Sequence, residues 1–236
     1  MTQLSIVIPA YNEERRIRPM LTDYLAFFQS ADVELIVVLN GCTDRTLEIV
    51  QEFQKQYPTK LRYLNLEQAL GKGGAVKAGL LAATGNWRGF VDADASTAPA
   101  ELNRLWQLLK PSHYDGVIAS RWLPGAQVWR SSWLRKFASW LFVWLVRRRF
   151  HMPFFDTQCG AKIFTTTLVE AIMPNLSVIN MAFDVELLYN ATKQGYRFLE
   201  VPTVWVDKTS STLFRSPFGF IKNSYQIFKT ILTIKR

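Results

Sequence analysis

Residues Trp87–Thr97 read WRGFVDADAST, a stretch in which two acidic side chains directly follow a short apolar run. The run Gly89–Val91 is typical of a buried strand in a parallel sheet. Asp92 and Asp94 would point to the same side of an extended segment. Because neighbouring carboxylates repel unless a cation lies between them, the pattern predicts a Mg²⁺ or Mn²⁺ site that holds a phosphorylated ligand. A polar turn after a strand is the alternative interpretation of the two aspartates, and the surrounding sequence is needed to distinguish the two.

Apolar runs alternate with helix-forming stretches through the first half of the chain. The runs typical of buried strands are Leu4–Pro9, Val33–Leu39, Leu61–Leu66, Trp87–Val91 and Gly116–Ser120. Helices are predicted at Glu13–Phe28, from Thr43 or Asp44 through Phe53, at Ala75–Ala83 and at Ala98–Leu109. This alternation predicts an α/β fold, a Rossmann-like and mostly parallel sheet flanked by helices.

Polar residues follow several of the predicted strands. Asn12, Asn40, Asp92 and Asp94 all come just after apolar runs, so we expect them at one edge of the sheet, where ligands of such folds bind. The stretch Gly71-Lys72-Gly73-Gly74 is interpreted as a loop before a helix. Such a loop lets backbone N–H groups approach an anion, and Lys72 adds a positive charge. A flexible turn is the alternative reading of this stretch.

The composition predicts an anionic partner. The chain has 236 residues, enough for one large domain, and its 28 Lys and Arg against 19 Asp and Glu give a net charge of +9. No helix-turn-helix, zinc-finger or RNA-binding signature occurs, so nucleic acid is not the expected partner. Cys42 and Cys159 have neither metal-site nor disulfide spacing, which favours a reducing, cytoplasmic setting.

Two basic, aromatic segments in the second half predict amphipathic helices that lie in a membrane interface. The first runs from Ser131 or Ser132 to about Arg149, with three tryptophans on one side and cations at both ends. The second lies within Pro217–Arg236 and places four apolar side chains at helical spacing: Ile221, Tyr225, Phe228 and Leu232. A buried core helix is the alternative for the first. We expect no secretory signal, because the N-terminus has neither a positively charged region nor a cleavage site. We also expect no transmembrane span, because no apolar run reaches about 18 residues.

Six stretches together resemble a known family. They are IVIPAYNEE at 6–14, GKGGAV at 71–76, the Asp92–Asp94 pair, Ser120-Arg121, DTQCGAK at 156–162 and FDVELL at 183–188. These are similar to family 2 glycosyltransferases with the GT-A fold, in particular to the polyprenyl-phosphate branch and its dolichyl-phosphate β-glucosyltransferases. The resemblance covers nearly the whole chain. It implies a single GT-A domain at 1–236, with a nucleotide-sugar-binding half at 1–120 and an acceptor- and membrane-facing half at 121–236.

The resemblance also implies roles for individual residues. Those expected at the nucleotide sugar are Pro9, Tyr11, Glu13, Asn40, Lys72 and Asp92. Asp92 and Asp94 are expected to hold Mg²⁺ or Mn²⁺ on the diphosphate. Those expected at the acceptor phosphate are Arg121, Arg135 and Lys162, and those expected to be catalytic are Asp94, Asp156 and Arg121. Leu39 and Asn40 replace two acidic residues of the family turn, so the base preference stays open.

The implied activity is inverting transfer from a nucleoside diphosphate sugar, with UDP-glucose as the expected donor, to polyprenyl or dolichyl phosphate. The expected location is the cytoplasmic face of a membrane, with peripheral attachment. A phosphate monoester has a second pKa of about 6, so this nucleophile is largely ionised at neutral pH and a general base is nearly redundant. Two alternatives stay open. One is a glycosyltransferase acting on a glycan or glycolipid hydroxyl, which needs a base such as Asp156 or Asp184. The other is a non-catalytic, membrane-associated nucleotide-sugar binder.

Overall fold

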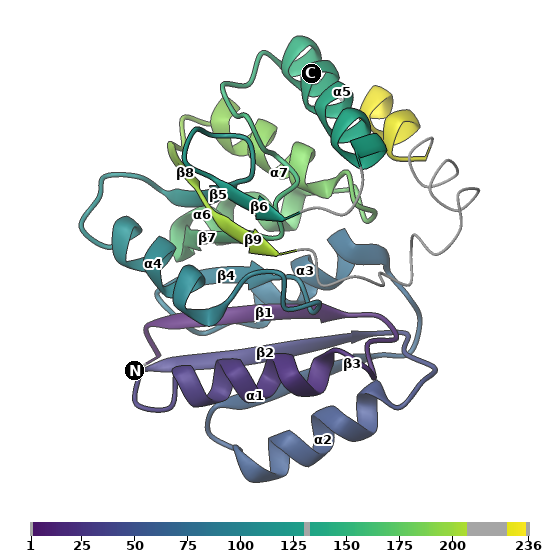
Figure 1. Ribbon diagram of the computed structural model, residues 1–236, viewed down its shortest axis with the longest axis vertical. Coiled ribbons are helices and arrows are strands. Elements are labelled where there is room, and N and C mark those ends of the chain that lie inside the picture. Colours follow the sequence, from purple (N-terminus) through teal and green to yellow (C-terminus); the bar gives the residue numbers. More distant parts are fainter. Residues whose placement is uncertain (1, 130–132, 207–225, 235–236) are drawn as a thin grey trace.

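A central sheet with helices on both faces organises the computed structural model, which describes residues 2–129, 133–206 and 226–234, without the side chains of 130–141 (Figure 1). The strands are β1 (Leu4–Ala10), β2 (Val33–Asn40), β3 (Leu61–Leu66), β4 (Trp87–Val91), β5 (Gly116–Ser120), β6 (Gln127–Trp129), β7 (Ala161–Thr165), β8 (Phe198–Pro202) and β9 (Val204–Val206). The helices are α1 (Ile17–Phe27), α2 (Thr46–Gln56), α3 (Gly71–Ala82), α4 (Pro99–Leu109), α5 (Trp133–Phe150), α6 (Thr166–Ile172), the 3₁₀ turn η1 (Met173–Asn175) and α7 (Phe183–Lys193).

Seven strands form the sheet, in the order β3-β2-β1-β4-β7-β5-β8. Six of them are parallel to one another, and β7 is antiparallel to its neighbours β4 and β5. The predicted mostly parallel α/β sheet flanked by helices is therefore confirmed. A separate pair, β6 and β9, lies beside it. Because β7 begins where β4 ends, the residues before Ala161 lie at the same edge as those after Val91.

Successive side chains of the central strands point to opposite faces, and both faces are covered. Leu4, Ile6 and Ile8 of β1 pack in a cluster with α1, α2 and α4. Val7 of the same strand packs in a second cluster with α3, α6 and α7. The central strands therefore read as continuous apolar runs because they are buried from both sides.

Two predicted helices begin elsewhere than expected. The helix predicted from Glu13 begins at Ile17. The residues between Glu13 and Ile17 form turns, and the Glu13 N–H donates to Thr46 Oγ1 at 2.8 Å, outside any helix. The glycine stretch predicted as a loop is instead the first turn of α3, which begins at Gly71. Close packing explains those glycines: a Cβ at Gly73 would lie 2.8 Å from the carbonyl oxygen of Val178.

The predicted membrane-facing segments form helices where the structure describes them. Helix α5 spans Trp133–Phe150, and residues 226–233 form a second helix beside it (Figure 1). Val146 and Phe150 are buried in a third cluster that also contains Ile231. Trp144 stays exposed, so α5 is neither a fully buried core helix nor detached from the domain. Within the described part of the chain, no helix has the length and apolar character to cross a membrane.

Candidate active site

The loops after the first three strands are tied together at one edge of the sheet. Asn12, which follows β1, accepts hydrogen bonds at Oδ1 from the backbone N–H groups of Thr43 at 2.8 Å and Asp44 at 3.3 Å. Asn40, at the end of β2, accepts one at Oδ1 from Leu70 N at 2.7 Å. The expected gathering of strand-end polar groups is therefore present, but both amide oxygens are used within the protein.

Asp92 and Asp94 follow β4 at this edge. Lys72 Nζ lies 2.6 Å from Asp92 Oδ1, so the first turn of α3 brings its ammonium to the carboxylate pair. Asp94 Oδ1 accepts the Ser96 N–H at 2.9 Å. Burial raises the pKa of Asp94, and the nearby charge of Asp92 raises it further. The pair thus repel each other, as their spacing in the sequence predicts.

The donor set at this pair fits a divalent cation with oxygen ligands. Both carboxylates lie at the end of β4, and each offers oxygen atoms, the ligand type that Mg²⁺ and Mn²⁺ prefer. Among the described residues no cluster of three or more His, Cys, Asp or Glu side chains could hold a metal. A cation here would have few protein ligands, and this leaves coordination positions for phosphate oxygens.

Gly160, in the DTQCGAK stretch directly before β7, supports Asp92. Its carbonyl oxygen accepts the Asp92 N–H at 3.1 Å. A Cβ at Gly160 would overlap the Asp92 carboxylate, so only glycine leaves that side chain its position. No role for Gly160 was predicted from the sequence. The short apolar run that follows Gly160 could have indicated a strand, but not that this strand pairs antiparallel with β4.

Lys162 lies behind this turn and does not reach the surface. The side chain is fully buried, and Nζ lies 2.6 Å from both Asp184 Oδ1 and the Cys159 carbonyl oxygen. Burial raises the pKa of Asp184, although Lys162 opposes that effect. The assignment of Lys162 to the acceptor phosphate stays a prediction that this geometry does not favour, because its charge faces Asp184 and supports the turn at Gly160.

Arg121 and Asp156 form a second ion pair, beside the end of β5. The fully buried Asp156 carboxylate accepts hydrogen bonds from Arg121 Nε at 2.7 Å, Arg121 Nη2 at 3.0 Å and Arg121 N at 3.0 Å. Burial works to raise the pKa of Asp156, but Arg121 outweighs it and holds that pKa below its ordinary value. Asp156 is thus suited to orient Arg121, and the geometry does not favour it as a general base.

Arg121 follows β5, which is separated from β4 only by β7 in the sheet, so Arg121 begins at the same sheet edge as Asp92 and Asp94. Burial works to lower the pKa of Arg121, but Asp156 and, to a smaller extent, Asp92 raise it. The guanidinium also lies over the Trp205 ring, 5.5 Å from its centroid. Arg135, the other predicted phosphate ligand, is on α5 with its side chain outside the described residues.

The remaining residues predicted at the nucleotide lie along β1 and the turn after it. Pro9 is half-buried in β1, and Tyr11 is exposed. The Glu13 carboxylate accepts two hydrogen bonds from Arg16, each 2.5 Å long. Burial raises the pKa of Glu13, and the charges of Asp94 and Asp92 contribute, so Glu13 lies close to the carboxylate pair. The roles of these residues at a nucleotide stay predictions.

Comparisons with known proteins agree with this architecture. Residues 5–172 match the model of Glycosyl transferase family 2. The chain is 33% identical to dolichyl-phosphate beta-glucosyltransferase of Dictyostelium discoideum, over 98% of this chain and 73% of that protein. It is 36% identical to the Drosophila melanogaster protein of the same name, over 92% of this chain and 70% of the other.

A solved structure shows the same fold. It is glucosyl-3-phosphoglycerate synthase from Mycobacterium tuberculosis, in complex with Mn²⁺, UDP and glucosyl-3-phosphoglycerate. The two chains superpose with a TM-score of 0.72 at 20% identity, over 98% of this chain and 79% of that one. The predicted GT-A fold is confirmed. The chain belongs to glycosyl transferase family 2, as its motifs predict.

Proposed function

We propose that this chain is an inverting glycosyltransferase that moves glucose from UDP-glucose to the phosphate of a polyprenyl lipid. The observation on which this mainly rests is the juxtaposition, at one sheet edge, of the carboxylates Asp92 and Asp94 and a guanidinium, Arg121, that Asp156 orients. The relatives named dolichyl-phosphate beta-glucosyltransferase support the choice of sugar and acceptor.

On the donor side, Asp92 and Asp94 would hold Mg²⁺ or Mn²⁺. Such an ion, when bound, would neutralise the negative charge that builds up on the leaving diphosphate. The mycobacterial structures in complex with Mn²⁺ or Mg²⁺ and UDP support this assignment by analogy of fold. Lys72 binds Asp92 and holds a positive charge where the diphosphate would lie. Gly160 fixes the position of the first carboxylate.

On the acceptor side, the protein has to position a nucleophile that is already charged. A phosphate monoester is largely ionised at neutral pH, because its second pKa is about 6. Arg121 offers a fixed guanidinium, and such groups bind phosphate with strong, directional hydrogen bonds. Direct attack on the anomeric carbon inverts its configuration, which gives a β-linked product from an α-linked donor.

Transfer to a sugar hydroxyl is less well supported. That reaction needs a carboxylate base, and the two carboxylates considered for it, Asp156 and Asp184, are both buried in ion pairs. A non-catalytic binder would have no need of the fixed Arg121–Asp156 pair.

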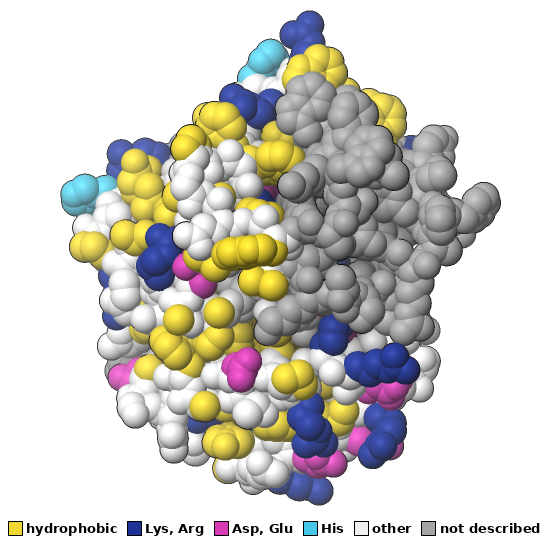
Figure 2. All heavy atoms as spheres, viewed as in Figure 1, with side chains coloured by type: hydrophobic (Ala, Val, Ile, Leu, Met, Phe, Trp, Pro, Cys, Tyr) yellow, Lys and Arg dark blue, Asp and Glu magenta, His cyan; other side chains and the backbone are white. Residues whose placement is uncertain are grey.

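We also place the protein at the cytoplasmic face of a membrane, attached peripherally. Hydrophobic side chains and cations lie close together at the end of the molecule that bears α5 (Figure 2). Phe228 and Leu232, on the helix at 226–233, are exposed although they are large and apolar. Exposed aromatic and aliphatic side chains with nearby cations are typical of helices that lie in a lipid headgroup region.

A panel of donors and acceptors tests the proposed function. Purified protein is incubated with radiolabelled UDP-glucose or GDP-mannose and with polyprenyl phosphate or a soluble sugar, in Mg²⁺ or in EDTA. We expect label in the lipid only with UDP-glucose, polyprenyl phosphate and metal. Transfer to the soluble sugar, with none to the lipid, would overturn the proposal, and so would undiminished transfer in EDTA.

A further inference from the structure

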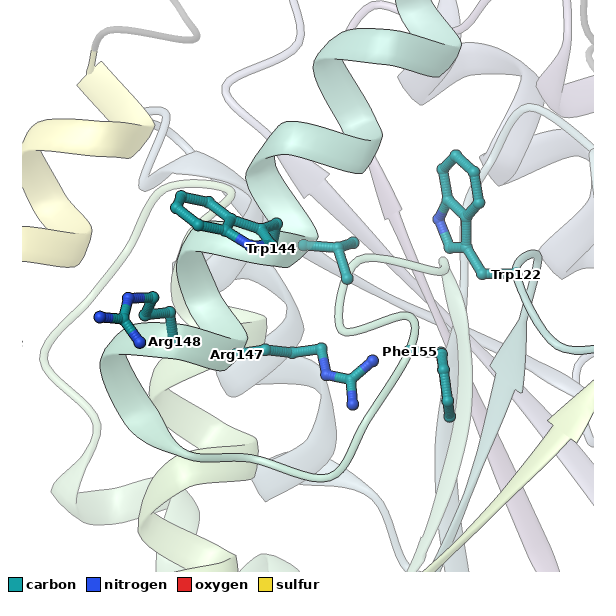
Figure 3. A pocket seen from close by; sticks show the side chains of 6 residues that line it. Trp122, Trp144, Arg147, Arg148 and Phe155 are labelled. Carbon is teal, nitrogen blue, oxygen red and sulfur yellow. The ribbon is translucent and has the colours of Figure 1, made fainter.

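A cavity of about 530 Å³ lies between α5 and the segments that follow β5 and precede β7 (Figure 3). Its volume falls within the range of about 300–1,000 Å³ typical of sites for small molecules. The described residues that line it are Trp122, Val143, Trp144, Arg147, Arg148 and Phe155. Trp122 directly follows Arg121, and Phe155 directly precedes Asp156. Two residues of the cavity wall are therefore the sequence neighbours of the Arg121–Asp156 ion pair.

The three arginines at the end of α5 have different surroundings. Arg149 donates hydrogen bonds to the carbonyl oxygens of Ile231 and Leu232, so it joins α5 to the neighbouring helix. Arg148 extends away from the other lining side chains, whereas Arg147 extends across the cavity toward Phe155 (Figure 3). The Arg147 guanidinium carbon lies 4.4 Å from the centroid of the Phe155 ring. Arg147 and Arg148 both line the cavity, but only the Arg147 guanidinium extends across it, toward walls that are mostly aromatic and aliphatic.

This lining matches a ligand with an anionic end and an apolar body. A small hydrophilic anion would leave the exposed Trp144 ring in contact with water, and an uncharged lipid would leave Arg147 without a counter-charge. Burying apolar surface is favourable by about 25 cal/mol per Å², and a guanidinium binds phosphate more strongly than a neutral donor does. Trp144 and Phe155 are 49% and 42% exposed, so the cavity opens to the surface of the protein.

We propose that this cavity binds the phosphate-proximal isoprene units of the polyprenyl phosphate acceptor, with Arg147 at the phosphate end and Trp122, Val143 and Trp144 along the chain. The inference rests on the proposed function and deepens it, because it assigns the acceptor to particular residues. Trp122, which lines the cavity, directly follows Arg121 in the sequence. Val146 and Phe150, buried beside this wall, fix the part of α5 that bears Arg147.

The test compares Arg147→Met, which removes the charge but keeps most of the side-chain volume, with Arg148→Met and with Trp144→Ala. Lys193→Met, an exposed cation at the end of α7, is the control with unchanged activity. Circular dichroism melting shows that each variant is folded. KM is measured separately for polyprenyl phosphate and for UDP-glucose, and binding of polyprenyl phosphate in detergent micelles is followed by tryptophan fluorescence.

We expect Arg147→Met to raise the acceptor KM by about tenfold or more, the usual effect of losing a charge-assisted hydrogen bond, with the donor KM unchanged. Trp144→Ala should raise the acceptor KM more for a long polyprenyl chain than for a short one, and Arg148→Met should have a smaller effect than Arg147→Met. Equal effects of Arg147→Met and Arg148→Met would overturn the proposal, and so would an equal rise in the donor KM.

The binding measurement separates this inference from the proposed function. If the wild-type protein transfers no sugar to lipid, the proposed function fails, yet weaker polyprenyl phosphate binding by Arg147→Met would still support the cavity. Equal binding by the wild type and Arg147→Met would overturn it. Phosphatidylglycerol micelles and polyprenol without phosphate serve as competitors, and displacement by either as effective as by polyprenyl phosphate would show that the site has another ligand.

Discussion

Cations have different partners at the sheet edge that holds Asp92 and along the last turns of α5. At the sheet edge each lysine or arginine meets a carboxylate: Lys72 meets Asp92, Lys162 meets Asp184 and Arg121 meets Asp156. On α5, Arg147 and Arg148 form no ion pair with any described residue, and Arg147 lies over an aromatic ring. The first region is fixed in advance for a small, highly charged ligand, and the second leaves charge and apolar surface available for an amphiphilic one.

The largest expected effect is at the carboxylate pair. Asp94→Asn should lower transfer by about 10²–10³-fold or more, because it removes charge that stabilises the leaving group through the metal. The measurement is kcat with UDP-glucose and polyprenyl phosphate, together with Mn²⁺ binding by electron paramagnetic resonance. Asp23→Asn, an exposed aspartate of α1, is the matched control. Wild-type Mn²⁺ affinity and turnover in Asp94→Asn would remove the metal assignment.

The second-largest effect is expected at the buried Lys162–Asp184 ion pair, which lies behind the sheet edge. Lys162→Met should lower the free energy of unfolding by about 3–5 kcal/mol, because it leaves the Asp184 carboxylate buried without a counter-charge. Adding Asp184→Leu should recover much of that loss, since a buried ion pair can be replaced by apolar groups at little cost. Urea unfolding measures both variants. If Lys162 instead bound the acceptor phosphate, Lys162→Met would keep its stability and raise only the acceptor KM.

A smaller effect is expected at Gly160. Gly160→Ala places a Cβ against the Asp92 carboxylate and should weaken Mn²⁺-dependent UDP binding by about tenfold, an amount equal to about 1.4 kcal/mol. Calorimetric titration measures this, and polyprenyl phosphate binding should be unchanged. Gly195→Ala is the control, because Gly195 has a φ of 90° and open space around it, so the variant strains the backbone away from the site. Equal UDP affinity in the two variants would contradict the packing argument.

The smallest effect is expected at the surface near α5. Replacing both Phe228 and Leu232 by serine should lower binding to anionic liposomes by about tenfold or less, because side chains are only partly buried in an interface. Gln226 and Thr233, exposed on the same helix, provide the matched double serine variant. Sedimentation with liposomes at low salt measures binding. A wild-type protein that stays entirely in the supernatant would contradict the interfacial model.

The sequence was most informative where a structural feature is local. The buried strands Leu4–Ala10 and Val33–Asn40, and the position of Asp92 and Asp94 after β4, follow from runs of neighbouring residues. Helix α5 was also predicted with nearly its observed bounds, because tryptophans and flanking arginines mark both its face and its ends.

Features that depend on distant contacts were missed or misread. The antiparallel insertion of β7 between β4 and β5 pairs residues far apart in the chain, so neither the strand's place nor the role of Gly160 could be read from spacing. The glycines of 71–74 were interpreted as a loop, because nothing local indicates that Val178 and Phe183 pack against them. The burial of Lys162 beside Asp184 also has no local signal in the sequence, while its assignment to the acceptor phosphate stays a prediction.

The most direct test of the central claim is the identity of the product. Protein, UDP-glucose labelled in the sugar, polyprenyl phosphate and Mg²⁺ are incubated together, and the lipid fraction is analysed by mass spectrometry and nuclear magnetic resonance. We predict a glucosyl polyprenyl phosphate with a β-configured anomeric carbon bonded to the phosphate oxygen. A product whose glucose is joined to a hydroxyl group, or an α-configured phosphodiester, would contradict the account.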